Sequence, residues 1–436
     1  MPPERSLEEI IQERAFAGLL QTHAQPFFQL CNSLGRQSCD TWAKKHFHQL
    51  VSAADSLESF LDDYGARFNR TYAALREFVA SLRWFGMSGF SLSHLEGRLE
   101  SYDLEATLSS QAFGQARASL RSAREFIDET VRELLEQIVR ECDALGLERT
   151  PELYPEQRID ALAPRQRLPR NVGQEDLVDE NQKIAEVASK YLASCDMLDE
   201  LGVHTLADPT RRNELLARCC SEARARVYEA TVHNLQSTYD TNIKNSVVEG
   251  RDSRLPRLRG HLSTALHLLE AVTFLTHFVE RHEGGQRNEE VERRITQVVQ
   301  RARVQEVILN HLLTEAVRFM SSGRGIADEL LQAYTNLQEL VVELPEDLKL
   351  HARPASLIVG IVGHYGTPVE LELDGQRCNA GSILELLVTV GSNPDARRYV
   401  FRGDENPLRD IGLLFQSGLG ERGMDALPEQ LAYLRS

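Results

Sequence analysis

The chain has 436 residues, of which 42% are hydrophobic and 26% charged, and its formal net charge is −16. This length exceeds one ordinary hydrophobic core, so we expect two to four domains. The acidic balance argues against nucleic acid and against an anionic membrane as the main partner, because both attract clustered basic surface.

The cysteines and the apolar segments favour a cytoplasmic protein. The chain has seven cysteines, an odd number, without CxxC spacing, which disfavours a disulfide framework and a cysteine zinc site. Residues 1–14 are charged and lack the apolar segment of a signal peptide. The longest uncharged apolar stretch, residues 354–369, contains three glycines and is too short to span a membrane.

The first three quarters of the chain has a helical pattern. We expect a helical region over residues 1–150, a proline-rich linker or long loop over 151–178, and a helical bundle region over 179–338. Within these regions, apolar spacing predicts helices over 114–147, over 258–279 and from about 288 to 320. The helix over 258–279 is densely apolar, so we expect it to be buried.

The pattern changes near residue 339 to that of a small α+β domain. Strand composition marks residues 340–344, 369–373 and 398–402, and Asp374-Gly375 is a strong hairpin signal. Helical runs lie between them at 353–364 and 382–390, and another starts near Pro407. The predicted order over residues 339–417 is β-α-β-β-α-β-α. A C-terminal tail, 418–436, carries leucines at helical spacing.

His351 is the residue of this domain best placed for chemistry. It lies just before a predicted helix whose first turn contains Pro354. Free backbone N–H groups and the helix dipole favour an anion there, and Arg353 adds a fixed positive charge. A neutral imidazole can be a nucleophile and a protonated one a leaving group, so a phosphohistidine is chemically reasonable. The alternative is an ordinary surface histidine.

Two motifs in this domain resemble those of the HPr phosphocarrier family of the bacterial phosphotransferase system. Leu350-His351-Ala352-Arg353-Pro354-Ala355 resembles its active-site loop, and Asn379-Ala380-Gly381-Ser382-Ile383 resembles its second motif. The resemblance covers about residues 339–417. It implies an open-faced sandwich, in which three helices cover one face of a four-stranded antiparallel sheet.

The resemblance also implies roles for individual residues. His351 would accept a phosphoryl group on Nδ1, and Arg353 would stabilise it. Ser382 would be the target of an HPr kinase, or alternatively a plain helix N-cap. Partner proteins would dock on Ile383, Leu384 and Leu387. The implied partners are an enzyme I-like phosphoryl donor and an unidentified acceptor protein, without a cofactor.

Several residues depart from the family pattern. Gly381 replaces a usual lysine, and Glu385 replaces a common glycine. The first helix is unusually apolar, with Ile361 on its outer side and Gly360, Gly363 and His364 where polar residues are usual. We hypothesise that N-terminal helices or a partner cover this helix. The alternative is a slightly apolar exposed helix. The tail could dock on the body, mediate self-association or fray.

Residues 1–335 resemble no family that we recognise and lack a P-loop, GxGxxG and HExxH. Histidine and glutamate recur on two helices in the order HxxE or HxxxE, at His267 and Glu270, His277 and Glu280, and His311 and Glu315. Di-iron bundles use the reverse order, and the first two pairs would lie roughly 80° apart around their helix. We therefore expect no metal.

These observations favour a regulatory phosphocarrier, in which phosphoryl exchange on His351 is coupled to a helical partner-binding or sensory body. It would carry a transient phosphohistidine rather than act as a true catalyst. One alternative is a helical scaffold whose HPr-like domain binds partners without phosphotransfer. Another is a helical-bundle metalloprotein or enzyme with a regulatory appendage. Amphipathic helices could also support a homo-oligomer.

Overall fold

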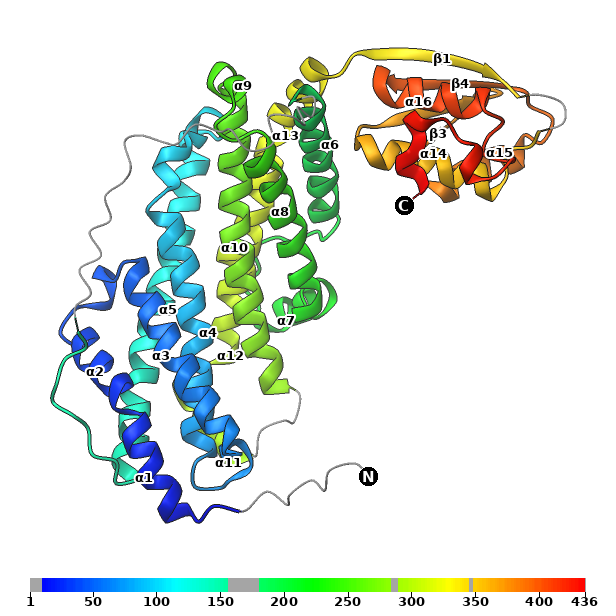
Figure 1. Ribbon diagram of the computed structural model, residues 1–436. Coiled ribbons are helices and arrows are strands. Elements are labelled where there is room, and N and C mark those ends of the chain that lie inside the picture. Colours follow the sequence, from blue (N-terminus) through cyan, green and yellow to red (C-terminus); the bar gives the residue numbers. More distant parts are fainter. Residues whose placement is uncertain (1–9, 156–179, 284–288, 345–347, 436) are drawn as a thin grey trace, which may run out of the picture. The chain divides into compact units, whose positions relative to one another are not determined.

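The computed structural model describes residues 10–155, 180–283, 289–344 and 348–435 (Figure 1). They are mostly helical, with a small four-stranded antiparallel sheet near the C-terminus. Most of the predicted linker over 151–178 lies outside the described residues. Contacts divide the chain into two compact units built from separated segments: residues 1–168, 198–233 and 260–320, and residues 169–197, 234–259 and 321–436.

The helical part contains α-helices of between 5 and 35 residues. Its α-helices are α1 (Glu13–His23), α2 (Gln25–Leu34), α3 (Lys44–Asp63), α4 (Ala73–Glu96), α5 (Ser110–Ala144), α6 (Glu180–Asp199), α7 (Pro209–Cys219), α8 (Glu222–Asn242), α9 (Val247–Arg251), α10 (Arg254–Glu283), α11 (Glu289–Val298), α12 (Arg301–Glu306) and α13 (Thr314–Tyr334). Short 3₁₀ turns, η1 (Cys39–Thr41), η2 (Ala66–Phe68), η3 (Leu99–Tyr102) and η4 (Leu104–Ala106), connect the early helices.

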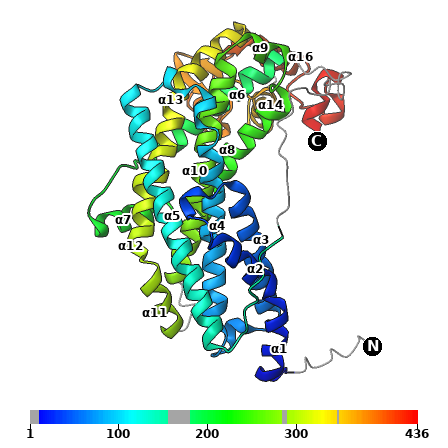
Figure 2. The same ribbon diagram turned by 90° about the vertical axis from the view of Figure 1, so that its left-hand side faces the viewer.

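The first unit is organised around α4, α5 and α10, which lie side by side in both views (Figures 1 and 2). Phe85 of α4 meets Phe278 of α10 edge to face, with ring centroids 5.1 Å apart. On its other side α4 approaches α3 so closely that a Cβ at Gly89 would lie 2.2 Å from the Phe47 ring. Glycine therefore permits this helix–helix contact.

The apolar helix α10 is buried, as its sequence predicts. Its segment Arg254–Arg281 is long and apolar enough to cross a membrane by length and composition alone, but 83% of the relevant window is buried inside the protein. The core helix of a bundle has the same composition.

The prediction of one continuous helix from about 288 to 320 is wrong. It is divided into α11, α12 and the π-helical segment η5 (Val307–Leu313), which leads into α13. Gln300 has an extended backbone between α11 and α12. The Thr314 hydroxyl donates to the Leu309 carbonyl at 2.7 Å, five residues back, which supports the wider turn. The apolar stripe is retained across these breaks, so periodicity does not reveal them.

The C-terminal elements follow the predicted order. They are β1 (Leu337–Glu343), α14 (Ala352–Tyr365), β2 (Val369–Leu373), β3 (Gln376–Asn379), α15 (Ile383–Ser392), β4 (Arg398–Asp404) and α16 (Glu405–Gln416). The spatial strand order is β1-β4-β2-β3, with antiparallel neighbours. Asp374 and Gly375 both have positive φ, as a two-residue hairpin turn requires.

The two faces of this sheet differ in chemistry. Val369, Leu371 and Leu373 of β2 are buried, and α15 and α16 pack against the sheet. On the other face, Arg402 of β4 pairs with Glu339 at 2.9 Å and with Glu372 at 2.5 Å. This alternation is typical of an antiparallel sheet with one solvated face.

The C-terminal tail belongs to the core of this domain. It comprises η6 (Met424–Ala426) and η7 (Glu429–Arg435), and its Leu419, Leu427 and Leu431 are buried among residues of α14 and α16. The predicted end of the domain at residue 417 therefore does not coincide with the end of its hydrophobic core.

Acidification is expected to destabilise the first unit through His261. This side chain is fully buried, its Nε2 lies 2.8 Å from the Thr107 hydroxyl, and burial lowers its pKa to about 4. Between pH 6.5 and 4, His261 is protonated in the unfolded chain but neutral in the folded chain. The stability that this histidine contributes above pH 6.5 is therefore lost as the pH falls. The loss for this one group is on the order of 3 kcal/mol at pH 4.

Urea unfolding at pH 7 and pH 4.5 checks this expectation. Both tryptophans, Trp42 and Trp84, lie in the first unit, so their fluorescence follows that unit alone. His261→Gln keeps a hydrogen-bonding side chain but cannot titrate, and should show a smaller loss of unfolding free energy on acidification. An identical pH dependence in the variant would contradict this role of His261.

Candidate functional site

His351 is the N-cap residue of α14. Its backbone is extended, and its Nδ1 accepts a hydrogen bond from the Arg353 N–H at 3.4 Å. Proline at 354 has no N–H to donate, which suits the first turn of a helix. The neutral ring therefore keeps its lone pair on Nδ1, directed at the positive end of α14.

The other ring nitrogen of His351 has a partner that was not predicted. Its Nε2 lies 3.0 Å from Oε1 of Glu421, and the two side chains are 53% and 33% exposed. About half of the His351 side chain is thus exposed to solvent, while Nε2 has an ion-pair partner. No motif marks Glu421, because it lies seventy positions away, beyond the predicted end of the domain.

A compact turn places Glu421 over α14. Gly418 and Leu419 close α16 with the hydrogen bonds of a Schellman motif, Leu419 N–H to the Leu414 carbonyl and Gly418 N–H to the Phe415 carbonyl. Gly420 follows with φ +73°, and a Cβ there would lie 2.7 Å from Cδ1 of Leu357 in α14. Only glycine satisfies both the backbone angle and this close approach.

The tail also covers the outer side of α14. A Cβ at Gly360 would lie 2.9 Å from Cδ2 of Leu434. The rings of His364 and Tyr433 stack with centroids 3.8 Å apart, and the Tyr433 hydroxyl donates to the buried Asp410 carboxylate at 2.7 Å. Part of the hypothesised cover of this helix thus exists, and the C-terminal tail supplies it on the outer side.

Helix α6, in the same compact unit, contacts the opposite end of α14. The Gln182 amide donates to the Tyr365 carbonyl at 2.9 Å and accepts from the Asn406 amide at 3.1 Å. Gly366, the left-handed C-cap of α14, lies against the Glu186 side chain. At 1.5 Å per residue, this contact is roughly 20 Å from His351 along the helix. It leaves the histidine uncovered.

The second motif forms the start of α15. Ser382 is the N-cap and its Oγ accepts from the Glu385 N–H at 3.4 Å, while the Glu385 carboxylate accepts from the Asn379 N–H at 3.0 Å. A Cβ at Gly381 would lie 3.1 Å from Val362 of α14. Glycine at 381 thus allows a close approach to α14, and the Glu385 carboxylate binds a backbone N–H of the segment that precedes α15.

An exposed apolar patch lies on α15 beside this motif. Ile383, Leu384 and Val388 are 42%, 71% and 59% exposed. Leu384 and Val388 are four residues apart and so share a helix face. Leu387, expected in this surface, instead packs partly against the core, and Val388 takes its place.

The histidine and glutamate pairs of the helical part have separate partners. His267 pairs with Glu270 at 2.9 Å, whereas His277 pairs with Glu222 at 2.9 Å and Glu280 accepts from the Glu222 N–H. Among the described residues, no group of three or more histidine, cysteine or acidic side chains converges as a metal site would require.

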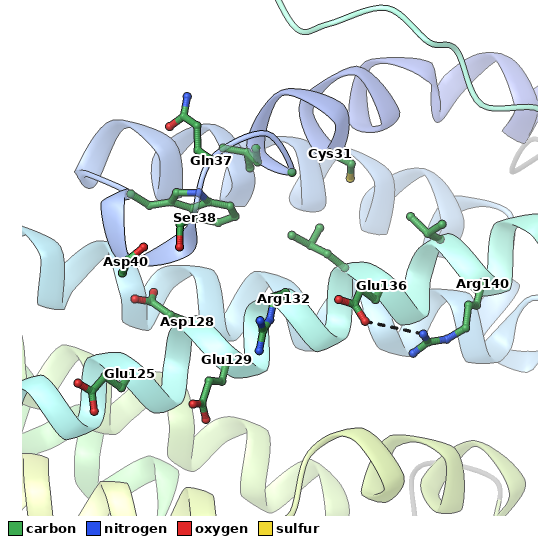
Figure 3. Close-up of a pocket in the computed structure, with 15 residues that line it drawn as sticks. Cys31, Gln37, Ser38, Asp40, Glu125, Asp128, Glu129, Arg132, Glu136 and Arg140 are labelled. Carbon is green, nitrogen blue, oxygen red and sulfur yellow. Dashed lines mark ion pairs between the residues drawn. The ribbon is translucent and has the colours of Figure 1, made fainter.

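A groove of about 760 Å³ lies in the first unit between α5 and the segment from α2 to Trp42 (Figure 3). Apolar side chains, including Leu34 and Leu135, form part of its lining. Its labelled acidic residues are Asp40, Glu125, Asp128, Glu129 and Glu136. Burial raises the pKa of Asp128 to about 6, although Arg124 hydrogen-bonds to it and opposes the shift. The lining also contains Arg132 and Arg140, of which Arg140 pairs with Glu136, so the groove carries charges of both signs.

Comparison of the chain with protein-family models, with curated proteins and with solved structures gives no match. Any functional assignment must therefore rest on the residues and their geometry.

Two glycine substitutions test how the tail is held. Gly418→Ala introduces a side chain at φ +79° with nothing within 4 Å, whereas Gly420→Ala adds an overlap with the buried Leu357. We expect the first to lower the opening free energy of the tail by about 1 to 2 kcal/mol, and the second by roughly a further 1 to 3 kcal/mol.

Hydrogen–deuterium exchange of the amides in α14 and η7 measures this opening free energy. Equal effects of the two substitutions would show that the tail does not pack on Leu357 as described.

Proposed function

We propose that the C-terminal domain is an HPr-like phosphocarrier domain in which His351 accepts and donates a phosphoryl group. One observation carries the proposal: an exposed histidine caps a helix, with the lone pair of Nδ1 directed at the helix N-terminus. The strand order and the motifs around His351 and Ser382 support it.

The reaction requires a nucleophile and a place for negative charge. The Nδ1 lone pair attacks phosphorus, the bond from phosphorus to the donor breaks, and the leaving group takes its electron pair. The phosphoryl oxygens then meet the first free N–H groups of α14, including that of Arg353, which is released from Nδ1. The exposed Arg353 guanidinium can add a charge-assisted bond.

The apolar patch of Ile383, Leu384 and Val388 would dock the donor and acceptor proteins. Exposed apolar side chains that share a helix face are typical of protein interfaces, and α15 packs against α14, the helix that His351 caps. Ser382 lies at the edge of this patch. A phosphate on its hydroxyl would put about two negative charges next to the docking surface and regulate transfer.

The helical part would give this carrier a regulatory role. Transport of phosphoryl groups alone does not require about 335 additional residues. The contact of α6 with the C-terminal end of α14 offers a physical connection between helices and carrier, distant from the reacting nitrogen.

Incubation of the full chain with phosphoenolpyruvate and enzyme I tests the proposal. We expect stoichiometric, acid-labile phosphorylation that His351→Ala abolishes. His204→Ala removes another exposed histidine, in the first unit, and should leave labelling unchanged. Labelling that survives His351→Ala would contradict the assignment.

The docking surface is tested by changing one exposed leucine at a time. Leu384→Ser should raise the KM for the phosphoryl-donor protein about fivefold or more, since truncation of a central interface residue costs above about 1 kcal/mol. Leu337→Ser changes a leucine of β1 with similar exposure, 68%, and should have little effect. Equal KM values for the two variants would place the interface elsewhere.

A further inference from the structure

We infer that Glu421 is a positioning residue for phosphoryl transfer: it holds the Nε2 proton of His351, so that Nδ1 is the nucleophile and the phosphorylated ring is a good leaving group. The inference rests on the proposed phosphocarrier function and adds a residue that lies outside the two motifs.

The geometry gives each ring nitrogen a different task. The Glu421 carboxylate can only accept, so at 3.0 Å it requires a proton on Nε2. The Arg353 N–H can only donate, so Nδ1 must carry a lone pair. Together the two partners select one neutral tautomer, the form that attacks phosphorus through Nδ1.

The same carboxylate acts in the next step. Attack by Nδ1 forms the P–N bond and leaves the Nε2 proton on the ring, which then carries a positive charge. The Glu421 carboxylate, with Oε1 3.0 Å from Nε2, compensates that charge as an ion pair. When an acceptor attacks phosphorus, the P–N bond breaks and its electron pair returns to Nδ1 of a neutral ring. Compensation of the ring charge therefore favours arrival of the phosphoryl group, and the proton kept on Nε2 lets departure release a neutral ring rather than an imidazolate.

The placement of Glu421 is built into the fold. An exposed ion pair between long side chains usually contributes little, because both must be ordered. Here the preceding residues are fixed: Leu419 is fully buried, and Gly420 lies against Leu357. The backbone therefore places Glu421 next to the start of α14. Formation of the ion pair then costs little additional conformational entropy of the backbone.

Two substitutions separate the two tasks. Glu421→Ala removes the acceptor and should raise the population of the tautomer with the proton on Nδ1. Glu421→Gln keeps an acceptor but removes the charge, and should slow both phosphorylation and hydrolysis of the phosphohistidine by about three- to tenfold, as loss of a modest charge-assisted bond predicts. The same changes at Glu429, an exposed residue of the same tail, are the controls.

Phosphoramidate, a small donor, removes protein docking from the measurement. Its P–N bond breaks, ammonia leaves and the phosphoryl group passes to Nδ1. The experiment uses the full chain with ¹⁵N-labelled histidine, so that the ring nitrogen shifts report the tautomer before phosphorylation and ³¹P spectra report the rates afterwards.

The outcomes are distinct. A tautomer shift in Glu421→Ala with slowed transfer in Glu421→Gln, and rates within twofold of wild type for both Glu429 variants, supports the inference. Wild-type tautomer and rates in both Glu421 variants would overturn it while leaving His351 as the acceptor. Absence of phosphorylation in the wild-type chain, with phosphoramidate and with enzyme I alike, would overturn the proposed function and with it the role of Glu421.

Discussion

The site depends on the two partners of the His351 ring: a backbone N–H that binds Nδ1 and a carboxylate that lies next to Nε2. Arg353 N–H fixes Nδ1 from the start of α14, and Glu421 fixes Nε2 from the tail. A surface imidazole without such partners would exchange tautomers and rotate. Here the ring is held by the helix that would bind the phosphoryl group and by the segment that follows the last helix of the domain. Both must be in place for the site to exist.

Close packing around the site accounts for three glycines. Gly360 admits Leu434, Gly420 admits Leu357, and Gly381 brings the start of α15 against Val362. Each glycine removes a side chain where two backbones or a backbone and a leucine approach closely. In the surface that results, the outer side of α14 is covered, whereas Ile383, Leu384 and Val388 of α15 remain exposed. A donor protein would therefore approach mainly over Leu384 and Val388.

The sequence predicts the C-terminal domain well because its signals are local. Alternation marks β2 to the residue, Asp374-Gly375 marks the hairpin, and the residues around His351 and Ser382 mark two helix starts. It does not predict Glu421, since its contact depends on a tail that returns across the domain. It also predicts Leu387 rather than Val388 in the exposed patch, because periodicity alone cannot fix the rotation of a ten-residue helix in which six residues are Ile, Leu or Val. In the helical part, buried α10 follows from composition, whereas the π-helical turn at Val307–Leu313 occurs without a proline or glycine to reveal it.

The central claim is that a phosphoryl group resides on Nδ1 of His351. The most direct measurement is ³¹P–¹⁵N correlation NMR of the full chain, labelled with ¹⁵N-histidine and phosphorylated by enzyme I and phosphoenolpyruvate. The account predicts one phosphorus–nitrogen coupling, to Nδ1 of His351, with the Nε2 resonance showing a bound proton. Coupling to Nε2, coupling to another histidine, or a phosphorus signal without any nitrogen coupling would contradict it.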